Sequence, residues 1–123
     1  MIRTSKVGYC EGIDVTVKSC ALEWRGLAPT WDMVMEFKRL RLSKEEYTRQ
    51  NLAILESPEG QAAVQHLVEY ARQHDPVVLL CYCRMNAFCH RVLLARHLEQ
   101  FGLEYGGEIT IGDFPFDDPP SAD

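Results

Sequence analysis

Apolar and polar residues follow one another with different periods along this chain of 123 residues. Residues 12–22 alternate β-branched apolar residues with polar ones, which predicts a strand with one wetter face. Residues 77–80 form an uninterrupted aliphatic run behind Pro76, which is typical of a parallel strand covered on both faces. Residues 2–7 and 108–111 are two further candidate strands.

Apolar residues three and four positions apart predict four helices, within residues 28–40, 43–57, 57–75 and 89–101. The hydroxyl groups of Thr30, Ser43 and Ser57 precede three of them and can accept a hydrogen bond from a first-turn N–H. Ser43 is followed three residues later by Glu46, which is the pattern of a capping box. Gly102 marks the end of the last helix.

The order of these elements predicts the fold class. A strand, then helices, a buried strand, a helix and a last strand indicate an α/β fold. We expect a single compact domain with a mostly parallel central sheet flanked by helices, in a Rossmann-like three-layer arrangement. The predicted α/β domain spans residues 1–112, and residues 113–123 form an acidic, Pro-rich C-terminal tail that we expect to fray.

Composition narrows the function classes. An apolar fraction of 46% and a charged fraction of 25% are ordinary for a soluble globular protein. The net charge of −5 argues against direct nucleic-acid binding, which needs a basic face. No apolar run approaches the roughly 20 residues needed to cross a bilayer. Residues 1–12 lack the apolar region of a secretory signal, so we expect a cytoplasmic location and no membrane partner. The pattern does not determine an oligomeric state.

Candidate chemistry is concentrated in "LLCYCRMNAFCHR", residues 79–91, which hold three of the five cysteines. The predicted buried strand ends at Cys81 and Cys83, and residues 89–91, Cys-His-Arg, begin the next helix. Ligands of open α/β sheets bind beyond the carboxyl ends of the strands. A helix N-terminus there offers free N–H groups and the positive end of the helix dipole. The sequence therefore predicts a functional site at this turn.

Each residue type at the turn suggests a role. Cys83 or Cys89 would be the reactive thiol, because a helix N-terminus and a nearby cation favour the thiolate. His90 would be the acid or base, and the guanidinium fork of Arg91 would hold an anion. Cys81 either belongs to the same reactive group or is an ordinary core residue.

The predicted loop completes this interpretation, since Arg84 and Asn86 would line the entrance and contact the ligand. The leading hypothesis is thiol-dependent chemistry on a small anionic ligand, phosphorylated or nucleotide-like. No cofactor is expected, and no residue is assigned to a metal.

A non-enzymatic alternative stays open, in which the cysteines and His90 bind zinc or respond to redox conditions. Cysteine and histidine are the usual zinc ligands. Adjacent Cys89 and His90 would point about 100° apart on a regular helix, so both could bind one ion only if the turn is irregular. A disulfide between Cys83 and Cys89 and an inert core cluster are further readings.

Residues outside the turn have simpler interpretations. Five cysteines cannot all pair within the chain, and we expect reduced thiols. Cys10 and Cys20 lie in apolar surroundings and are predicted to be packing residues. Trp24 and Trp31 are predicted to anchor the core.

The stretch "VVLLCYCRMNAFCHRVLLARHL" resembles the family called domain of unknown function 488. The resemblance extends upstream through "LAPTWDMVMEFK" and "SKEEYTRQNLAIL" and covers most of residues 24–101. It implies a compact α/β fold and a site, but no reaction. Signature positions that the resemblance carries over are Cys81, Cys89, His90 and Arg91, with Leu27, Ala28, Pro29, Lys38 and Tyr47 upstream. The chain departs from the family at Cys83, where related members often carry Glu.

Overall fold

A computed structural model describes residues 1–83 and 88–109 of the chain. Its sheet has four strands, all parallel, in the order β2-β3-β1-β4. The strands are β1 (Ile2–Lys6), β2 (Ile13–Asp14), β3 (Val77–Cys81) and β4 (Tyr105–Glu108). The aliphatic run of β3 lies between β2 and β1, which confirms the predicted central parallel strand.

Two strands differ in extent from the prediction. The alternation over residues 12–22 yields only β2, because the Asp14 carboxylate accepts the backbone N–H of Thr16 at 2.8 Å and turns the chain. The last strand begins at Tyr105 and ends at Glu108, three residues earlier than expected, and residues 110 and 111 lie outside the described part of the chain.

The helices begin where their hydroxyl caps predict. Thr30 accepts from the N–H of Met33, Ser43 from that of Glu46 at 3.0 Å, and Ser57 from the third residue of its helix. The second half of the capping box does not form, because the Glu46 carboxylate binds Arg49 instead. The helical elements are η1 (Leu22–Leu27), α1 (Trp31–Lys38), α2 (Lys44–Glu56), α3 (Pro58–Gln73), α4 (His90–Leu98) and η2 (Glu99–Phe101).

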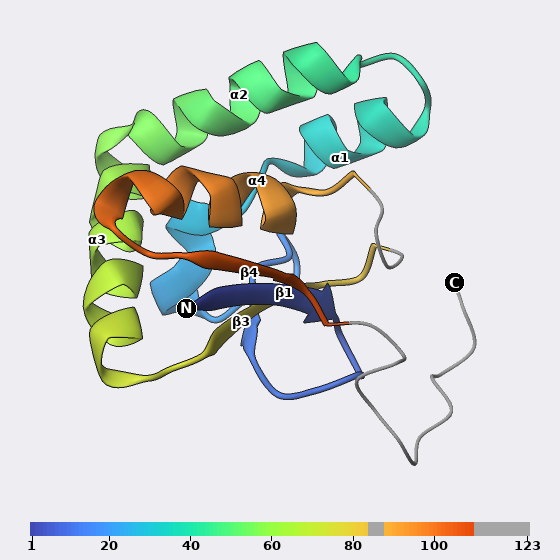
Figure 1. Cartoon of the computed structure of the whole chain (residues 1–123). Helices are drawn as coiled ribbons and strands as arrows, with labels where there is room; N and C mark the ends of the chain where they lie inside the picture. Colours follow the sequence, from blue (N-terminus) through green and yellow to red (C-terminus); the bar gives the residue numbers. More distant parts are fainter. Residues whose placement is uncertain (84–87, 110–123) are drawn as a thin grey trace.

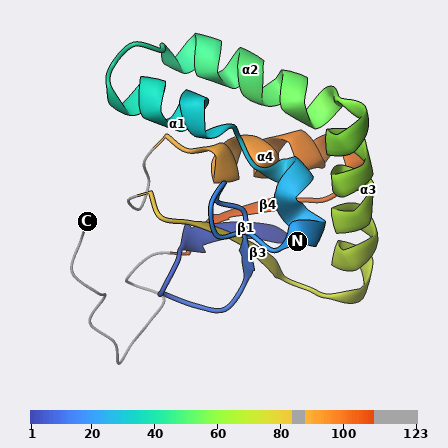
Figure 2. The same cartoon turned by 180° about the vertical axis from the view of Figure 1, so that it is seen from behind.

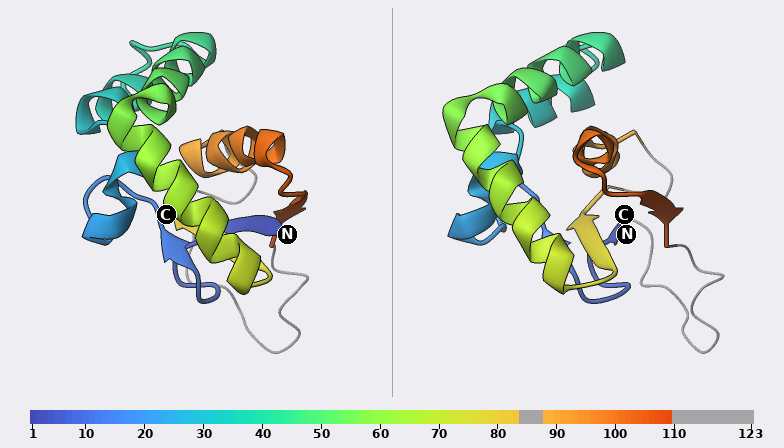
Figure 3. Two further views of the ribbon diagram at one scale, coloured as in Figure 1. Left: turned by 90° about the vertical axis from the view of Figure 1, so that its left-hand side faces the viewer. Right: turned by 60° about the vertical axis from the view of Figure 1, so that its left-hand side comes forward.

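The helices gather on one side of the sheet. Figure 1 shows α1, α2 and α4 above the strands and α3 running down past their left-hand end, and Figures 2 and 3 show the same arrangement from other sides. The α/β class, with a parallel sheet and flanking helices, is confirmed. The opposite face carries Val78 and Leu80, and Gly12 approaches both residues closely: a Cβ added at Gly12 would lie 2.5 Å from the Val78 carbonyl oxygen.

The core lies between the sheet and these helices. Its buried members include Ile2, Leu67, Leu79 and Leu94, from two strands and two helices. Trp24 is 6% exposed and anchors this core as predicted.

Some predicted packing residues lie nearer the surface. Trp31 is 43% exposed, so its predicted core role is wrong: it is the first residue of α1, and its ring lies under the Lys18 ammonium. Cys20 is buried and Cys10 half-buried. The predicted boundary at residue 112 and the tail 113–123 lie outside the described residues. No helix of the described part is both long and apolar enough to cross a bilayer.

Parallel pairing brings the carboxyl ends of all four strands to one edge of the sheet. Lys6 pairs with Cys81 in register, and Asp14 and Glu108 end the outer strands. Helices α2 and α4 both begin above this edge, on the right of Figure 1. The cysteine-rich turn therefore lies where ligand sites of parallel sheets occur.

A three-cysteine candidate site

Three sulfur atoms meet at the turn. The Sγ atoms of Cys81, Cys83 and Cys89 all lie within 4.8 Å of one another. Cys81 ends β3 and is fully buried, Cys89 precedes α4 and is 3% exposed, and Cys83 is half-buried. All three are free thiols, with 2.7 Å between the sulfurs of Cys81 and Cys89. We call these residues the three-cysteine cluster.

The three cysteines of the cluster differ in pKa. Hydrogen bonds from Cys81 and Cys89 lower the pKa of Cys83 to about 2 against the opposing effect of burial, and the positive charge of Arg91 adds to the lowering. Its hydrogen bond to Cys83 raises the pKa of Cys81 to about 11, and burial raises the pKa of Cys89 well above its usual value. The directions of these shifts favour Cys83 as the thiolate, with the two buried thiols as its donors.

Cys89 does not lie in a regular helical turn. Its backbone is extended, with φ −158° and ψ 152°, and α4 starts at the next residue. This conformation brings the Cys89 sulfur to 3.6 Å from Nδ1 of His90. The 100° separation expected on a regular helix does not apply, and neighbouring side chains converge. Burial and the raised pKa make Cys89 the poorer of the two nucleophile candidates, which favours Cys83.

His90 is 5% exposed, and its hydrogen bonding assigns its tautomer. Nε2 lies 2.8 Å from the Val15 carbonyl oxygen, which can only accept, so Nε2 carries the proton. Nδ1 is then left with a lone pair facing Cys89. Burial lowers the pKa of His90, so the ring is neutral near pH 7. It can accept a proton from the Cys89 thiol or bind a metal ion.

Arg91 is fully buried, and its donors face groups of this same chain. Its Nε and Nη2 donate to the two carboxylate oxygens of Glu108, at 2.7 and 3.1 Å. Its Nη1 donates to the Cys81 sulfur at 2.7 Å and to the Cys83 carbonyl oxygen at 3.1 Å. Burial opposes the charge, but these partners raise the pKa of Arg91 above its ordinary value.

The anion site predicted at Arg91 is therefore filled by the Glu108 carboxylate of the same chain. Any external anion would have to compete with a bidentate carboxylate, so the anionic ligand stays a prediction. Sequence reasoning missed Glu108, because the predicted last strand began at this residue, whereas β4 ends there. Arg84 and Asn86, the other predicted ligand contacts, lie outside the described residues.

Tyr47 of α2 was named by the resemblance as a family position, but it was not among the predicted site residues. It is 4% exposed, and its ring packs against Phe37 and Phe88 with centroid distances of 5.3 and 5.5 Å. Burial, followed by the charges of the three-cysteine cluster, raises the pKa of Tyr47. A permanently protonated hydroxyl group therefore lies near the sulfurs.

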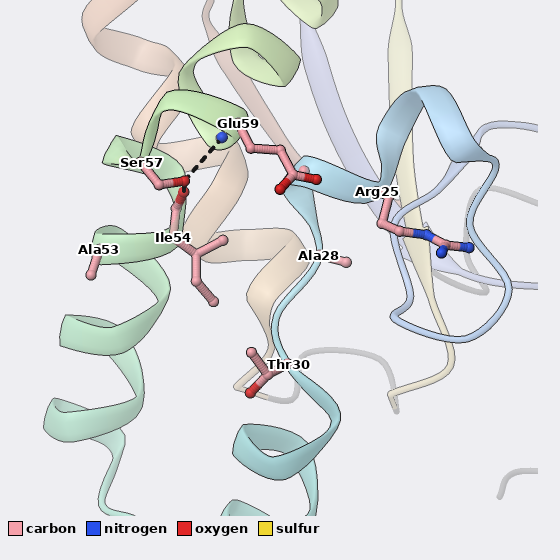
Figure 4. A pocket seen from close by; sticks show the side chains of 9 residues that line it. Arg25, Ala28, Thr30, Ala53, Ile54, Ser57 and Glu59 are labelled. Atoms are coloured by element: carbon pink, nitrogen blue, oxygen red, sulfur yellow. Dashed lines mark hydrogen bonds between the residues drawn. The ribbon is translucent and has the colours of Figure 1, made fainter.

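A cavity of about 420 Å³ lies elsewhere, between the segment that joins η1 to α1 and the junction of α2 with α3. Figure 4 shows Ile54, Ala28 and Thr30 around it, with the Ser57 hydroxyl bonded to the start of α3. Both hydroxyl groups at its wall serve as helix caps. The three-cysteine cluster does not line it, so the cavity adds nothing to that site.

A family model described as the active DUF488-N3 subclade matches residues 10–102. The chain belongs to the DUF488 family. The match includes the three-cysteine cluster, His90, Arg91 and Tyr47, whereas Glu108 lies beyond it. No curated protein and no solved structure matches this DUF488 chain. The family assignment confirms the resemblance read from the cysteine-rich turn, and its description specifies no reaction or ligand.

Proposed function

We propose that this DUF488 protein binds a zinc ion through the thiolates of Cys81, Cys83 and Cys89. The observation that carries the proposal is the mutual approach of the three sulfurs within 4.8 Å. Two thiolates on one tetrahedral zinc ion lie about 3.8 Å apart, given Zn–S bonds of about 2.3 Å. The cluster thus needs only a small rearrangement, mainly separation of Cys81 from Cys89.

His90 suits the fourth position. A sulfur and a nitrogen ligand on one zinc ion lie about 3.6 Å apart, given bonds of about 2.3 and 2.0–2.1 Å. Nδ1 of His90 lies 3.6 Å from the Cys89 sulfur. Metal-binding histidines usually donate their other ring N–H to a carbonyl or carboxylate, as Nε2 does here to Val15. Arg91 would donate to the bound sulfur of Cys81.

Elemental analysis of protein purified under reducing conditions tests the proposal. We expect about one zinc ion per chain, and loss of zinc in Cys83→Ser and Cys89→Ser. Cys20→Ser is the matched control, because Cys20 is also buried but lies outside the cluster. Added cobalt should give a thiolate-to-metal charge-transfer band. Absence of both bound zinc and this band would refute the proposal.

Thiol-dependent chemistry at Cys83 is a second candidate, favoured by its partial exposure and lowered pKa. The sulfur would bond to an electrophilic atom, and the leaving group would depart with the electron pair of the broken bond. The size of the pKa shift argues against this chemistry as the first choice. Nucleophilicity falls with pKa, with a Brønsted slope of about 0.4–0.5, so a thiolate this stable attacks slowly. The same stability is no handicap for a metal ligand.

A further inference from the structure

The inner face of α2 carries two polar residues at buried positions. Tyr47 is 4% exposed and Asn51 is 3% exposed, and Leu55 continues the same face. Residues four apart lie on one side of a helix. Helix α2 contacts α4, and Figure 1 shows the two helices side by side, both beginning above the carboxyl edge of the sheet.

Neither polar group is paired inside the part of the chain that the structure describes. The Tyr47 hydroxyl and the Asn51 amide form no hydrogen bond with residues 1–83 or 88–109, although both side chains are more than nine-tenths buried. Within the described ranges, neither the Tyr47 hydroxyl nor the Asn51 amide is among the side-chain polar atoms that are both unpaired and fully buried, so these groups keep some contact with solvent. Two unpaired polar groups one turn apart, on a face that is otherwise buried, are available to bind a ligand that enters from solvent.

Aromatic packing places the Tyr47 ring next to the cysteine-rich turn. Its ring lies against Phe88, which immediately precedes Cys89, and against Phe37 of α1. The charges of all three cluster cysteines act on its phenol group, which places that group within electrostatic range of the sulfurs. The phenol group therefore lies near the three-cysteine cluster.

We propose that Tyr47 and Asn51 form a polar subsite that binds a small, uncharged, carbonyl-containing molecule beside Cys83. An amide side chain offers one donor and one acceptor, and a phenol adds a donor, which together complement an amide or a similar neutral group. Neither residue contributes charge, and Arg91, the cation that donates to the three-cysteine cluster, is paired with Glu108. The subsite goes beyond the zinc proposal, since it requires only that Cys83 be reachable.

Two alkylating reagents of different shape test the subsite. Iodoacetamide carries an amide group with its carbonyl, whereas iodomethane carries no polar group of this kind. Both reagents react with Cys83 by forming an S–C bond and releasing iodide. In Tyr47→Phe the rate constant for Cys83 with iodoacetamide should fall about 3- to 10-fold, the effect of one lost hydrogen bond. The rate with iodomethane should stay the same. Asn51→Leu should give the same selective loss.

The control is Tyr70→Phe, the same chemical change on α3, where the ring stacks on His74. It should alter neither rate. Because Tyr47→Phe keeps the ring and removes an unpaired hydroxyl, its melting temperature should equal or exceed that of the wild type.

Three outcomes would overturn the subsite. The first is equal slowing of both reagents in Tyr47→Phe, which would indicate a change in the thiolate itself. The second is no slowing of iodoacetamide, or no reaction of Cys83 with it in the wild type. The third is a drop of several degrees in melting temperature, which would mean that the hydroxyl has a partner within the protein.

Discussion

Replacing Glu108 by Gln should strongly destabilise the fold. The change keeps the size of the side chain but removes the charge that faces a fully buried Arg91. Taking one partner from a buried ion pair typically costs about 3–5 kcal/mol, because the other charge is left without compensation. The sulfur of Cys81 and the carbonyl oxygen of Cys83 still accept from Arg91. We therefore expect a loss of about 3 kcal/mol in the free energy of unfolding, at the low end of that range.

Urea unfolding under reducing conditions, followed by circular dichroism, measures this loss. Glu69→Gln is the matched control, because its carboxylate pairs with Arg72 at 2.9 Å on the surface. Exposed pairs contribute little, so the control should unfold at the wild-type midpoint. If Glu108→Gln loses no more stability than Glu69→Gln, the pair is not desolvated and the reasoning fails.

The same variant tests the anion site predicted from the sequence. Without Glu108, the guanidinium fork of Arg91 loses its bidentate partner, and phosphate can take that place. Phosphate should therefore raise the unfolding midpoint of Glu108→Gln more than that of the wild type. Equal effects on both proteins would show that Arg91 does not bind external anions even when its internal partner is removed.

Three further predictions concern protons and metal. Because the pKa of folded Cys83 is about 2, the rate of its alkylation should be nearly constant from pH 5 to 8. In urea the rate should rise with pH, as for an ordinary thiol, and equal pH profiles of the folded and unfolded protein would contradict this. Burial lowers the pKa of His90 in the folded state, so stability should fall as the pH drops below the unfolded value of about 6.5, and His90→Gln should reduce that slope in urea titrations. A strong chelator should lower the melting temperature of the wild type but not of Cys89→Ser, and an equal drop in both would exclude a stabilising metal at the cluster.

The parts of the fold predicted correctly depend on local signals. The hydroxyl caps of α1, α2 and α3 act within one helical turn, and the aliphatic run of β3 needs only burial to become a strand. The alternation over residues 12–22 misled because the Asp14 side chain competes for backbone N–H groups just after Ile13. Trp31 was misplaced because composition cannot tell which side of α1 its first residue faces.

The site was predictable only as far as one strand–helix turn reaches. Cys81, Cys83 and Cys89 are close in sequence, so their meeting followed from the turn itself. Glu108 reaches Arg91 across 17 residues, through the register of β4 beside β1. Tyr47 of α2 precedes Cys81 by more than 30 residues. Contacts of this kind depend on how elements pack, which a single sequence does not state.

Charge around the carboxyl edge favours a cation over an anion at the cluster. The charges of Arg91 and Glu108 cancel, and Lys6 and Asp14, which end the strands on either side of β3, have opposite charges. His90 is neutral, so the thiolate of Cys83 remains as a net negative charge. An anionic ligand would meet this charge, whereas a zinc ion would be attracted by it and would also ionise Cys81 and Cys89. The resulting three-thiolate centre would carry one negative charge, beside an Arg91 that already donates to one of its sulfurs.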